Sequence, residues 1–369
     1  MPRKRVIPTL AWGALETLLG LLMAATAGWG VLALGYFDHL PREAQAALAA
    51  GFGLLALVLL GGFIWPRWRW RSLLAYGVCF AGLLGAWFSL HPSSQRRWQP
   101  EVALLPYATW QGDLVTVHNI RNFTYRTETD FTPAYYDKTF DLGQLDSVDL
   151  VTSYWMGPHI AHVFLTFGFG GKDHLAISIE ARKVAGEGYS SLKGFFRQYE
   201  LCYIAADERD VIRLRTNYRR DPPEDVYLYP LRAPREAIRR LFEEYLRQLN
   251  DLTVRPQFYN TLTANCTSCI WLNSRVNPGH VPFSWKILLS GHVAEYLYEQ
   301  GRLDRTLAFP DLQRRCHING RAQKADRLAD FSRQIRLPEL APLKLSCIER
   351  PCQAQAAVTA ASSAAASAR

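Results

Sequence analysis

The stretch His159-Ile160-Ala161-His162-Val163-Phe164-Leu165-Thr166-Phe167 predicts a strand that packs within a sheet. Successive side chains of a strand point to opposite faces, so His162, Phe164 and Thr166 share one face while the apolar residues between them share the other. His162 would then project from a packed sheet toward a cleft. A lone histidine in a strand is more often structural than catalytic, so this stretch by itself leaves both roles open.

Short alternating or β-branched runs around this stretch predict an antiparallel sheet. They cover residues 114–120, 148–155, 160–169, 174–180, 211–216 and 225–229. The period then becomes that of a helix, because apolar residues from Ile238 to Leu249 recur at helical spacing after Pro234. Further helices are expected over residues 266–274 and 285–300. Strands first and helices afterwards indicate the α+β class, with the helices packed on the sheet.

Three apolar runs near the start of the 369-residue chain, at residues 10–36, 46–65 and 73–90, approach or exceed the length that crosses a bilayer. A cleaved signal peptide would have a short apolar core, a small-residue cleavage site and no further spans. We therefore predict an uncleaved anchor of three N-terminal transmembrane helices.

The basic residues near these runs predict the orientation of the chain. Lys and Arg concentrate in short cytoplasmic loops, and here they cluster before the first span and between the second and third. The N-terminus would then be cytoplasmic, and everything after residue 91 would lie in the periplasm of a bacterium. Several charges of the net +9 belong to these loops, so we attribute the excess to topology and to attraction by anionic inner-membrane surfaces, not to nucleic acid. The clustered residues are Arg3, Lys4, Arg5, Arg67, Arg69 and Arg71.

Composition divides the chain into four parts. We predict a membrane anchor at residues 1–92, a Pro-rich polar linker at 93–112, a catalytic domain at 113–338 and a disordered tail at 339–369. Most of the tail is Ala and Ser without an aromatic residue, and such a composition cannot bury a core.

A second informative stretch is Asn265-Cys266-Thr267-Ser268-Cys269 at the expected start of a helix. A thiol attacks an ester or amide only as thiolate, which an imidazole or a helix N-terminus can generate, so Cys266 is a candidate nucleophile. Three other interpretations remain. Cys-x-x-Cys could be a redox pair, the thiols could bind zinc if His280 or Cys316-His317 joined them, or Cys266 could be inert. We predict neither a metal nor a cofactor.

Glu180 is the candidate that would orient the imidazole. It follows five residues of strand-like sequence, at a position where a buried strand would carry an apolar group. A carboxylate that holds the base is the relation found in Cys-His-acid sites. A surface ion pair with Arg182 is the alternative. Among the remaining cysteines, Cys347 and Cys352 could pair with each other or with Cys316, and the sequence leaves the connectivity open.

At these residues the chain resembles a known family, the external domain of Lnb-type lipoprotein N-acyltransferases, formerly a domain of unknown function. The likeness extends over about residues 113–336. It is carried by several motifs in one order: Val117-His118-Asn119-Ile120-Arg121-Asn122-Phe123-Thr124-Tyr125-Arg126, Ile160-Ala161-His162, Ser178-Ile179-Glu180-Ala181-Arg182-Lys183, Gly194-Phe195-Phe196-Arg197-Gln198-Tyr199-Glu200-Leu201, Asp207-Glu208-Arg209-Asp210, and Tyr259-Asn260-Thr261-Leu262-Thr263-Ala264-Asn265-Cys266-Thr267. The order His, acid, Asn-Cys is also similar to circularly permuted papain-like enzymes of the NlpC and lecithin–retinol acyltransferase group.

The resemblance implies a permuted papain-like domain and a thiol acyl transfer. Cys266 would be the nucleophile, His162 the base and then the acid, and Glu180 the third member. We expect the backbone N–H of Cys266, with Tyr259 or Asn265, to meet the oxyanion. Arg182 and Arg121 could bind a phosphate headgroup as bidentate donors, although ion pairing within the protein would account for each equally well.

The predicted function is that of a membrane-anchored periplasmic acyltransferase. It would move an acyl chain from a membrane phospholipid to an amine of a lipoprotein or related acceptor through a thioester on Cys266. Two alternatives stay open: a papain-like peptidase or amidase that cuts cell-wall peptide, and a membrane-tethered binding module without catalysis. The first needs an open polar cleft, whereas an acyltransferase needs an apolar groove that reaches the bilayer.

Overall fold

The computed structural model describes residues 6–38, 40–93, 95–337 and 340. These residues form two compact units. The anchor unit combines the described residues up to Gln99 with Ala181–Leu201 and Arg255–Ala264, and the sheet unit combines Pro100–Glu180, Cys202–Val254 and the described residues from Asn265 onward. Apart from Leu340, the tail predicted at 339–369 lies outside the described residues, and so do Cys347 and Cys352.

Three long helices make up most of the anchor unit, namely α1 (Val6–Gly35), α2 (Arg42–Ile64) and α3 (Arg69–Phe88). All three are long and apolar enough to cross a membrane, which confirms the predicted anchor. They pack around Met23, Ala56, Phe63 and Tyr76, while many of their leucines are exposed. Such exposure is expected where lipid is the solvent. Glu16 of α1 is charged but forms an ion pair with Arg69 at the start of α3.

Two later segments of the chain belong to the anchor unit. One carries α4 (Ser191–Phe195) and the other β11 (Gln257–Phe258). After α4, the Phe196 ring stacks on Tyr36 with centroids 5.3 Å apart, and Gln198 donates to the Tyr36 carbonyl at 2.6 Å. Arg197 donates to the Trp87 carbonyl at 2.6 Å. These contacts attach residues 196–198 to the ends of α1 and α3.

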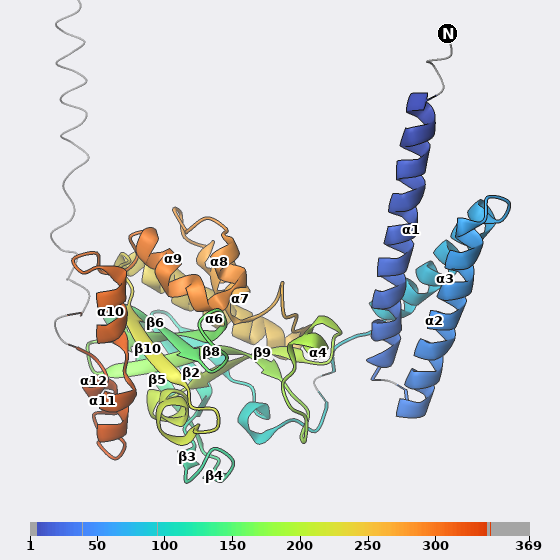
Figure 1. Cartoon of the computed structure of the whole chain (residues 1–369). Coiled ribbons are helices and arrows are strands. Elements are labelled where there is room, and N and C mark those ends of the chain that lie inside the picture. The colour runs from blue at the N-terminus through green and yellow to red at the C-terminus, as the bar shows by residue number, and fades with distance from the viewer. Residues whose placement is uncertain (1–5, 39, 94, 338–339, 341–369) are drawn as a thin grey trace, which may run out of the picture. The chain divides into compact units, whose positions relative to one another are not determined.

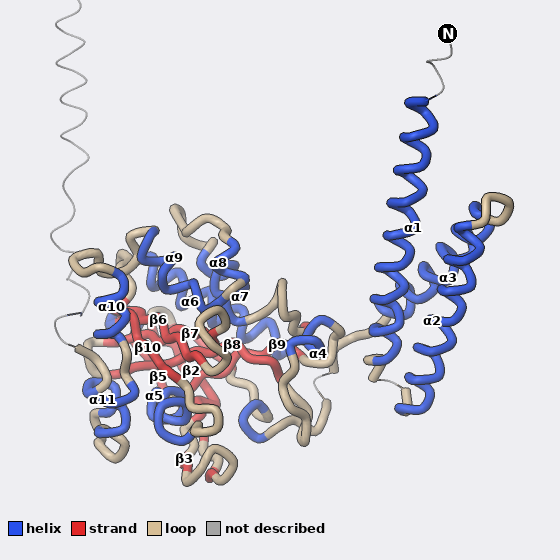
Figure 2. The backbone as a smooth tube through the Cα atoms, viewed as in Figure 1, coloured by secondary structure: helices blue, strands red, loops and turns tan. Residues whose placement is uncertain are grey.

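Strands between Tyr107 and Phe258 form a large mixed sheet (Figure 2), in the order β1-β2-β9-β8-β7-β6-β10, with β5 also paired to β2 and β11 to β9. Most pairings are antiparallel, as predicted, and β2 lies parallel to β9. A separate hairpin joins β3 (Thr124–Tyr125) and β4 (Phe131–Thr132). The strand bounds are β1 (Tyr107–Gln111), β2 (Leu114–Arg121), β5 (Tyr135–Asp141), β6 (Leu145–Tyr154), β7 (Ala161–Phe169), β8 (Asp173–Arg182), β9 (Glu200–Ala206) and β10 (Asp225–Pro230).

The two faces of β7 carry different chemistry. On one face Phe167 and Phe169 pack on Phe242 of α6 (Arg235–Val254), with centroids 4.9 and 5.4 Å apart. On the other face Thr166 donates to Glu208 of α5 (Glu208–Arg213) at 2.5 Å. Figure 1 shows α6, α8 and α9 on one side of the sheet, and Figure 2 shows α5 on the other. His162 has the same parity as Thr166, so it faces the side of α5.

Smaller helices follow α6 in the sheet unit. They are α7 (Cys266–Ser274), α8 (Trp285–Leu288), α9 (Val293–Glu299), α10 (Phe309–Cys316), α11 (Asn319–Lys324) and α12 (Phe331–Gln334). The prediction of a helix over residues 266–274 is confirmed. Asn265 caps it, because its side chain accepts from Ser268 N at 2.9 Å while Ser268 Oγ accepts from Asn265 N at 2.9 Å.

The strand predicted at residues 211–216 was wrong, since this run forms the end of α5 and the π-helical turn η3 (Leu214–Tyr218). A short buried run has the same composition in a helix and in a strand. The local signal that decides is Asp207, whose side chain accepts from Arg209 N at 2.8 Å and caps the helix.

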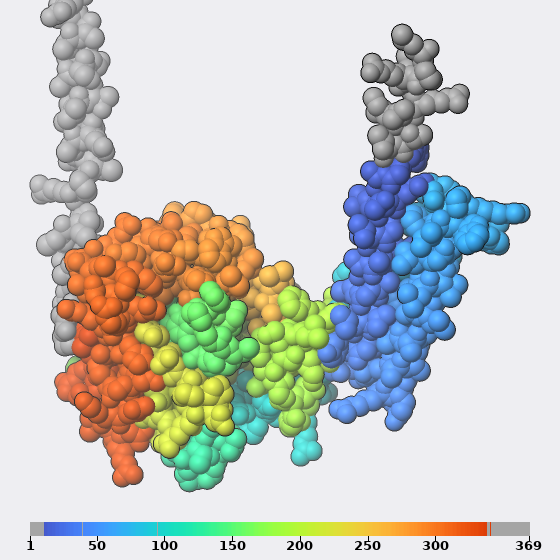
Figure 3. All heavy atoms as spheres, viewed as in Figure 1, coloured from blue at the N-terminus to red at the C-terminus, as the bar shows by residue number. Residues whose placement is uncertain are grey.

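The single helix predicted over residues 285–300 is instead interrupted between α8 and α9. Leu289 leaves the helical region, with φ −92° and ψ 81°. Gly291 N donates to His159 O at 3.0 Å, so this turn is pinned to the loop that joins β6 to β7. Figure 3 shows that loop in green against the orange segment. Tertiary contact therefore overrides helical periodicity here.

A side chain at position 291 should destabilise the sheet unit. A Cβ added to Gly291 would lie 2.1 Å from Pro158 O and 2.6 Å from His159 C, and backbone cannot yield as a flexible side chain does. We expect Gly291→Ala to lower the free energy of unfolding by about 1–3 kcal/mol, measured by thermal or denaturant unfolding of the detergent-solubilised protein. Gly320→Ala is the matched control. Gly320 lies within α11 with open space around its Cβ, so this change should be neutral or stabilise by up to about 1 kcal/mol. Equal stability of the two variants would contradict the packing described here.

Candidate active site

Strand pairing places His162 next to Glu180. In the antiparallel pair of β7 and β8, Leu165 lies opposite Ile177. Continuing that register toward the start of β7 brings His162 opposite Glu180 on the same face. On the other side, His162 pairs with Ser153 of β6. The imidazole is therefore positioned by three adjacent strands of the sheet, which is a rigid support for a reactive group.

Hydrogen bonds tie the histidine to its neighbours on β8. His162 Nε2 lies 3.1 Å from Glu180 Oε1 and 2.7 Å from Ser178 Oγ, and Ser178 Oγ donates to Glu180 Oε1 at 2.7 Å. The His162 residue is only 9% exposed. Glu180 and Ser178 therefore both contact the same ring nitrogen, Nε2.

The thiol of Cys266 completes this arrangement from α7. Its side chain is hydrogen-bonded to His162. Cys266 is the first residue of α7 and is partly exposed, and its thiol is free. The Asn265 cap, together with a hydrogen bond from Thr267 Oγ1 to Asn265 Oδ1 at 3.0 Å, fixes the start of the helix. The thiol of a partly exposed cysteine, an imidazole and a carboxylate thus form one connected set.

Burial and charge act against each other at the histidine and the carboxylate. Burial, the largest effect, and the charge of Arg215 would lower the pKa of His162. The charge of Glu180 and the hydrogen bonds with Cys266 and Glu180 together outweigh them, so the pKa rises to about 9. Burial would raise the pKa of Glu180, yet His162, Arg215 and Ser178 hold it well below its usual range. Imidazolium and carboxylate are therefore the favoured forms at neutral pH.

The second cysteine of the motif has a different environment. Cys269 lies one helical turn after Cys266, is 6% exposed, and its thiol is also free. Burial, followed by the neighbouring Cys266, raises the pKa of Cys269 to about 12. A buried thiol that resists ionisation is a poor partner for a redox pair. Among the described residues no cluster of three or more His, Cys, Asp or Glu could hold a metal ion.

The remaining predicted site residues lie elsewhere. In the sheet unit Arg121 is 4% exposed and donates to both oxygens of Asp210, at 2.8 to 3.1 Å. In the anchor unit Arg182 stacks over the Trp98 ring, 4.2 Å from its centroid, and the Tyr259 hydroxyl lies 3.3 Å from that of Tyr189. Headgroup binding by the two arginines and an oxyanion contact of Tyr259 stay predictions.

Two residues of the site were missed by sequence reasoning. Ser178 precedes Glu180 by two residues, so strand alternation places it on the same face, and this spacing was an available signal. Arg215 donates to Glu180 Oε1 at 3.4 Å and to Glu224 Oε2 at 3.2 Å. No local pattern marks Arg215, because it comes from the π-helical turn that was predicted as a strand.

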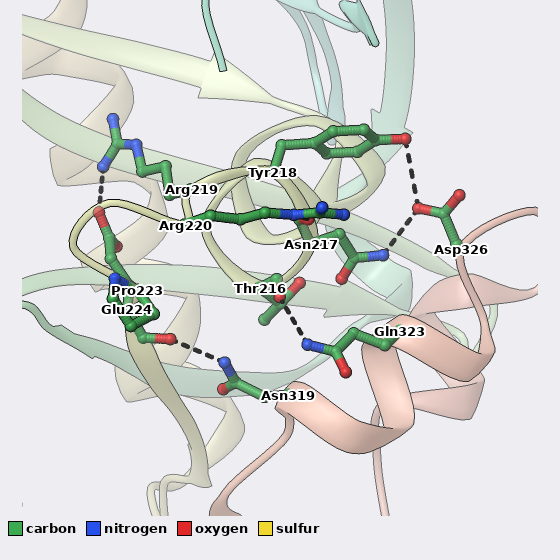
Figure 4. Close-up of a pocket in the computed structure, with 10 residues that line it drawn as sticks. All are labelled: Thr216, Asn217, Tyr218, Arg219, Arg220, Pro223, Glu224, Asn319, Gln323 and Asp326. Carbon is green, nitrogen blue, oxygen red and sulfur yellow. Dashed lines mark hydrogen bonds and ion pairs between the residues drawn. The ribbon is translucent and has the colours of Figure 1, made fainter. Parts of the chain in front are cut away.

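A polar cavity of about 600 Å³ adjoins this charged set. Figure 4 shows Arg219 joined to the carboxylate of Glu224, and Asn319 bonded to the Glu224 carbonyl, at 2.7 Å. Glu224 therefore both lines the cavity and bonds to Arg215. The full lining is Thr216, Asn217, Tyr218, Arg219, Arg220, Pro223, Glu224, Asn319, Gln323 and Asp326.

Comparison with known proteins identifies the domain. A search of curated proteins and a search of solved structures found no match. Residues 131–291 match the family model of the Lnb N-terminal periplasmic domain, and this segment contains His162, Glu180 and Cys266. With the three apolar helices, the match describes an inner-membrane protein with a periplasmic domain. Residues 131–291 therefore carry a domain of the Lnb type.

Proposed function

We propose that this protein is a thiol acyltransferase with a cytoplasmic N-terminus and a periplasmic active site. It takes an acyl chain from a membrane phospholipid and passes it to an amine of a lipoprotein or a related acceptor. The observation that carries the proposal is the connected set of Cys266, His162 and Glu180. An imidazolium held by a carboxylate favours a thiolate beside it, and a thiolate attacks esters.

In the first half of the reaction, Cys266 Sγ attacks the ester carbonyl carbon and the carbonyl oxygen becomes an oxyanion. Ser268 N and Cys269 N are bonded to Asn265, whereas the N–H groups of Cys266 and Thr267 have no carbonyl partner within the helix. These two groups at the start of α7 can meet the oxyanion. His162 gives its proton to the leaving alcohol oxygen, and a lysophospholipid departs while the thioester remains.

In the second half the acceptor amine attacks the thioester carbonyl. His162, now neutral, takes a proton from the attacking nitrogen, and Cys266 leaves as thiolate. An amide forms, the C–S bond breaks and the imidazolium returns. Glu180 keeps the imidazole oriented through both halves, since its carboxylate stays ionised while His162 gains and loses the proton.

Acyl labelling tests the nucleophile and the base. The full-length protein, incubated with phospholipid that carries a radiolabelled acyl chain, should acquire a label that hydroxylamine removes. Cys266→Ala should carry no label, because no sulfur can form the thioester. His162→Ala should form the adduct at least about 100-fold more slowly.

Cys269→Ala is the matched control for this experiment, because Cys269 lies on the same helix but is buried. It should label like the wild type. Equal label in Cys266→Ala and the wild type would contradict the mechanism. So would a wild-type protein that takes no label and cleaves cell-wall peptide, which is the outcome expected of a peptidase.

The rate of thioester formation should fall as pH rises through about 9, because His162 loses the proton that it must give to the leaving group. Glu180→Gln removes the charge that raises the pKa of His162, so in this variant the fall should move down toward the ordinary histidine value of about 6.5. Single-turnover labelling from pH 5 to 10 measures this rate, and an alkaline fall that stays in place in Glu180→Gln would refute the assignment.

The free energy of unfolding should depend on pH in the same direction. Because the pKa of His162 is raised in the folded state, its contribution to stability is fully present below about pH 6.5 and disappears as pH rises through about 9.

A further inference from the structure

We propose that Arg215 is a positioning residue, which holds the Glu180 carboxylate on His162 and is itself held by Glu224. This inference deepens the proposed function, since it concerns the same active site. Arg215 is 5% exposed, and its guanidinium bonds to Glu180 Oε1 and to Glu224 Oε2. A buried cation that bridges two carboxylates is costly unless it has a role that repays its desolvation.

Three hydrogen-bonding groups crowd around one oxygen atom of Glu180. Glu180 Oε1 receives Ser178 Oγ at 2.7 Å, His162 Nε2 at 3.1 Å and Arg215 Nη2 at 3.4 Å. Ser178 comes from the same strand as Glu180 and can move with it. Arg215 comes from η3, so it is the contact that fixes the carboxylate to a different element of the fold.

An aromatic ring supports Arg215 itself. Its guanidinium lies over the ring of Phe164, 5.8 Å from the centroid, and the His162 ring is 5.7 Å from the same ring. Phe164 thus supports both cations on one face of β7. The planar fork of an arginine can reach two carboxylates at once, which a lysine ammonium cannot do with the same geometry.

The charge of Glu224 is balanced as well. Glu224 is 5% exposed, and its carboxylate is bonded by Arg215, Arg219 and the Ser153 hydroxyl. Burial alone would raise the pKa of Glu224, but Arg215, Arg219 and Ser153 lower it to about 2. Positive and negative groups therefore alternate from His162 through Glu180, Arg215 and Glu224 to Arg219. No carboxylate in this series is left without a cation.

The test is alkylation of Cys266 by iodoacetamide, which measures the thiolate without any acyl donor. The Cys266 peptide is quantified by mass spectrometry in the full-length protein from pH 5 to 10. A free thiol ionises near pH 8.5, whereas a thiolate paired with an imidazolium reacts at pH 6. Arg215→Met should lower the rate at pH 6 about tenfold or more. At pH 10, where both proteins carry a thiolate, the rates should agree within about twofold. A variant that had merely lost structure would not show this pH-selective effect.

Arg219→Met is the matched control, because Arg219 also pairs with Glu224, while its other ion pair among the described residues is with Glu128 and not with Glu180. It should keep the rate at pH 6 within about twofold of the wild type. A double-mutant cycle tests the route of the effect. If Arg215 acts through Glu180, Glu180→Gln combined with Arg215→Met should be no slower at pH 6 than Glu180→Gln alone.

Arg215→Lys keeps the test decisive if Arg215→Met does not fold. It retains the charge but not the fork, and we expect a loss of about threefold or more at pH 6. Wild-type reactivity at pH 6 in the folded Arg215 variants, or additive losses in the cycle, would overturn the inference about Arg215. A wild-type Cys266 that is unreactive at pH 6 would instead overturn the proposed function. The two failures are therefore distinguishable.

Discussion

The ion pair between His162 and Glu180 is the interaction on which the site depends. Its energy comes from partial burial, since the His162 side chain is 11% exposed and that of Glu180 24%. Opposite charges that are largely shielded from water attract each other more strongly than the same charges at a surface. Burial also makes each charge costly without its partner, so the surrounding fold must hold both groups in place. The sheet does this by strand register for His162 and Glu180, and η3 does it from a separate element through Arg215.

The same face of the sheet carries a second buried polar cluster, which shows how the fold tolerates so many charges. Thr166 donates to Glu208, and Arg336 binds both Glu208 and Asp149, opposite Thr166 on β6. Glu208 is fully buried, which would raise its pKa, but Arg336, His174 and Ser332 together outweigh burial and lower the pKa to about 2. One cluster thus binds the end of the described chain to the sheet, while the other holds His162. The opposite face, packed on α6, is apolar.

The parts of the fold that the sequence predicted are those that local patterns determine. Alternation identified β2, β6, β7, β8 and β10, helical spacing identified α6, and the Asn265 cap marked the start of α7. The failures occurred where contacts distant in sequence decide the structure. Gly291 is pinned to His159, which interrupts a helix with good periodicity. Residues 211–216 are buried on every side, so their composition could not separate a helix from a strand. Arg215 was missed for the same reason.

The two cysteines of α7 show that environment, and not the motif, distinguishes the proposed nucleophile from its neighbour. Cys266 and Cys269 lie one turn apart on one helix and would be equivalent in a Cys-x-x-Cys pattern. Cys269 points into the protein among residues such as Tyr203 and Tyr245, which pack edge to face, and burial suppresses its ionisation. Cys266 occupies the first position of the helix, where unpaired N–H groups and the imidazole converge. The helix therefore buries one sulfur in the core and presents the other to the site, so the spacing that suggests a redox pair is a consequence of helical packing.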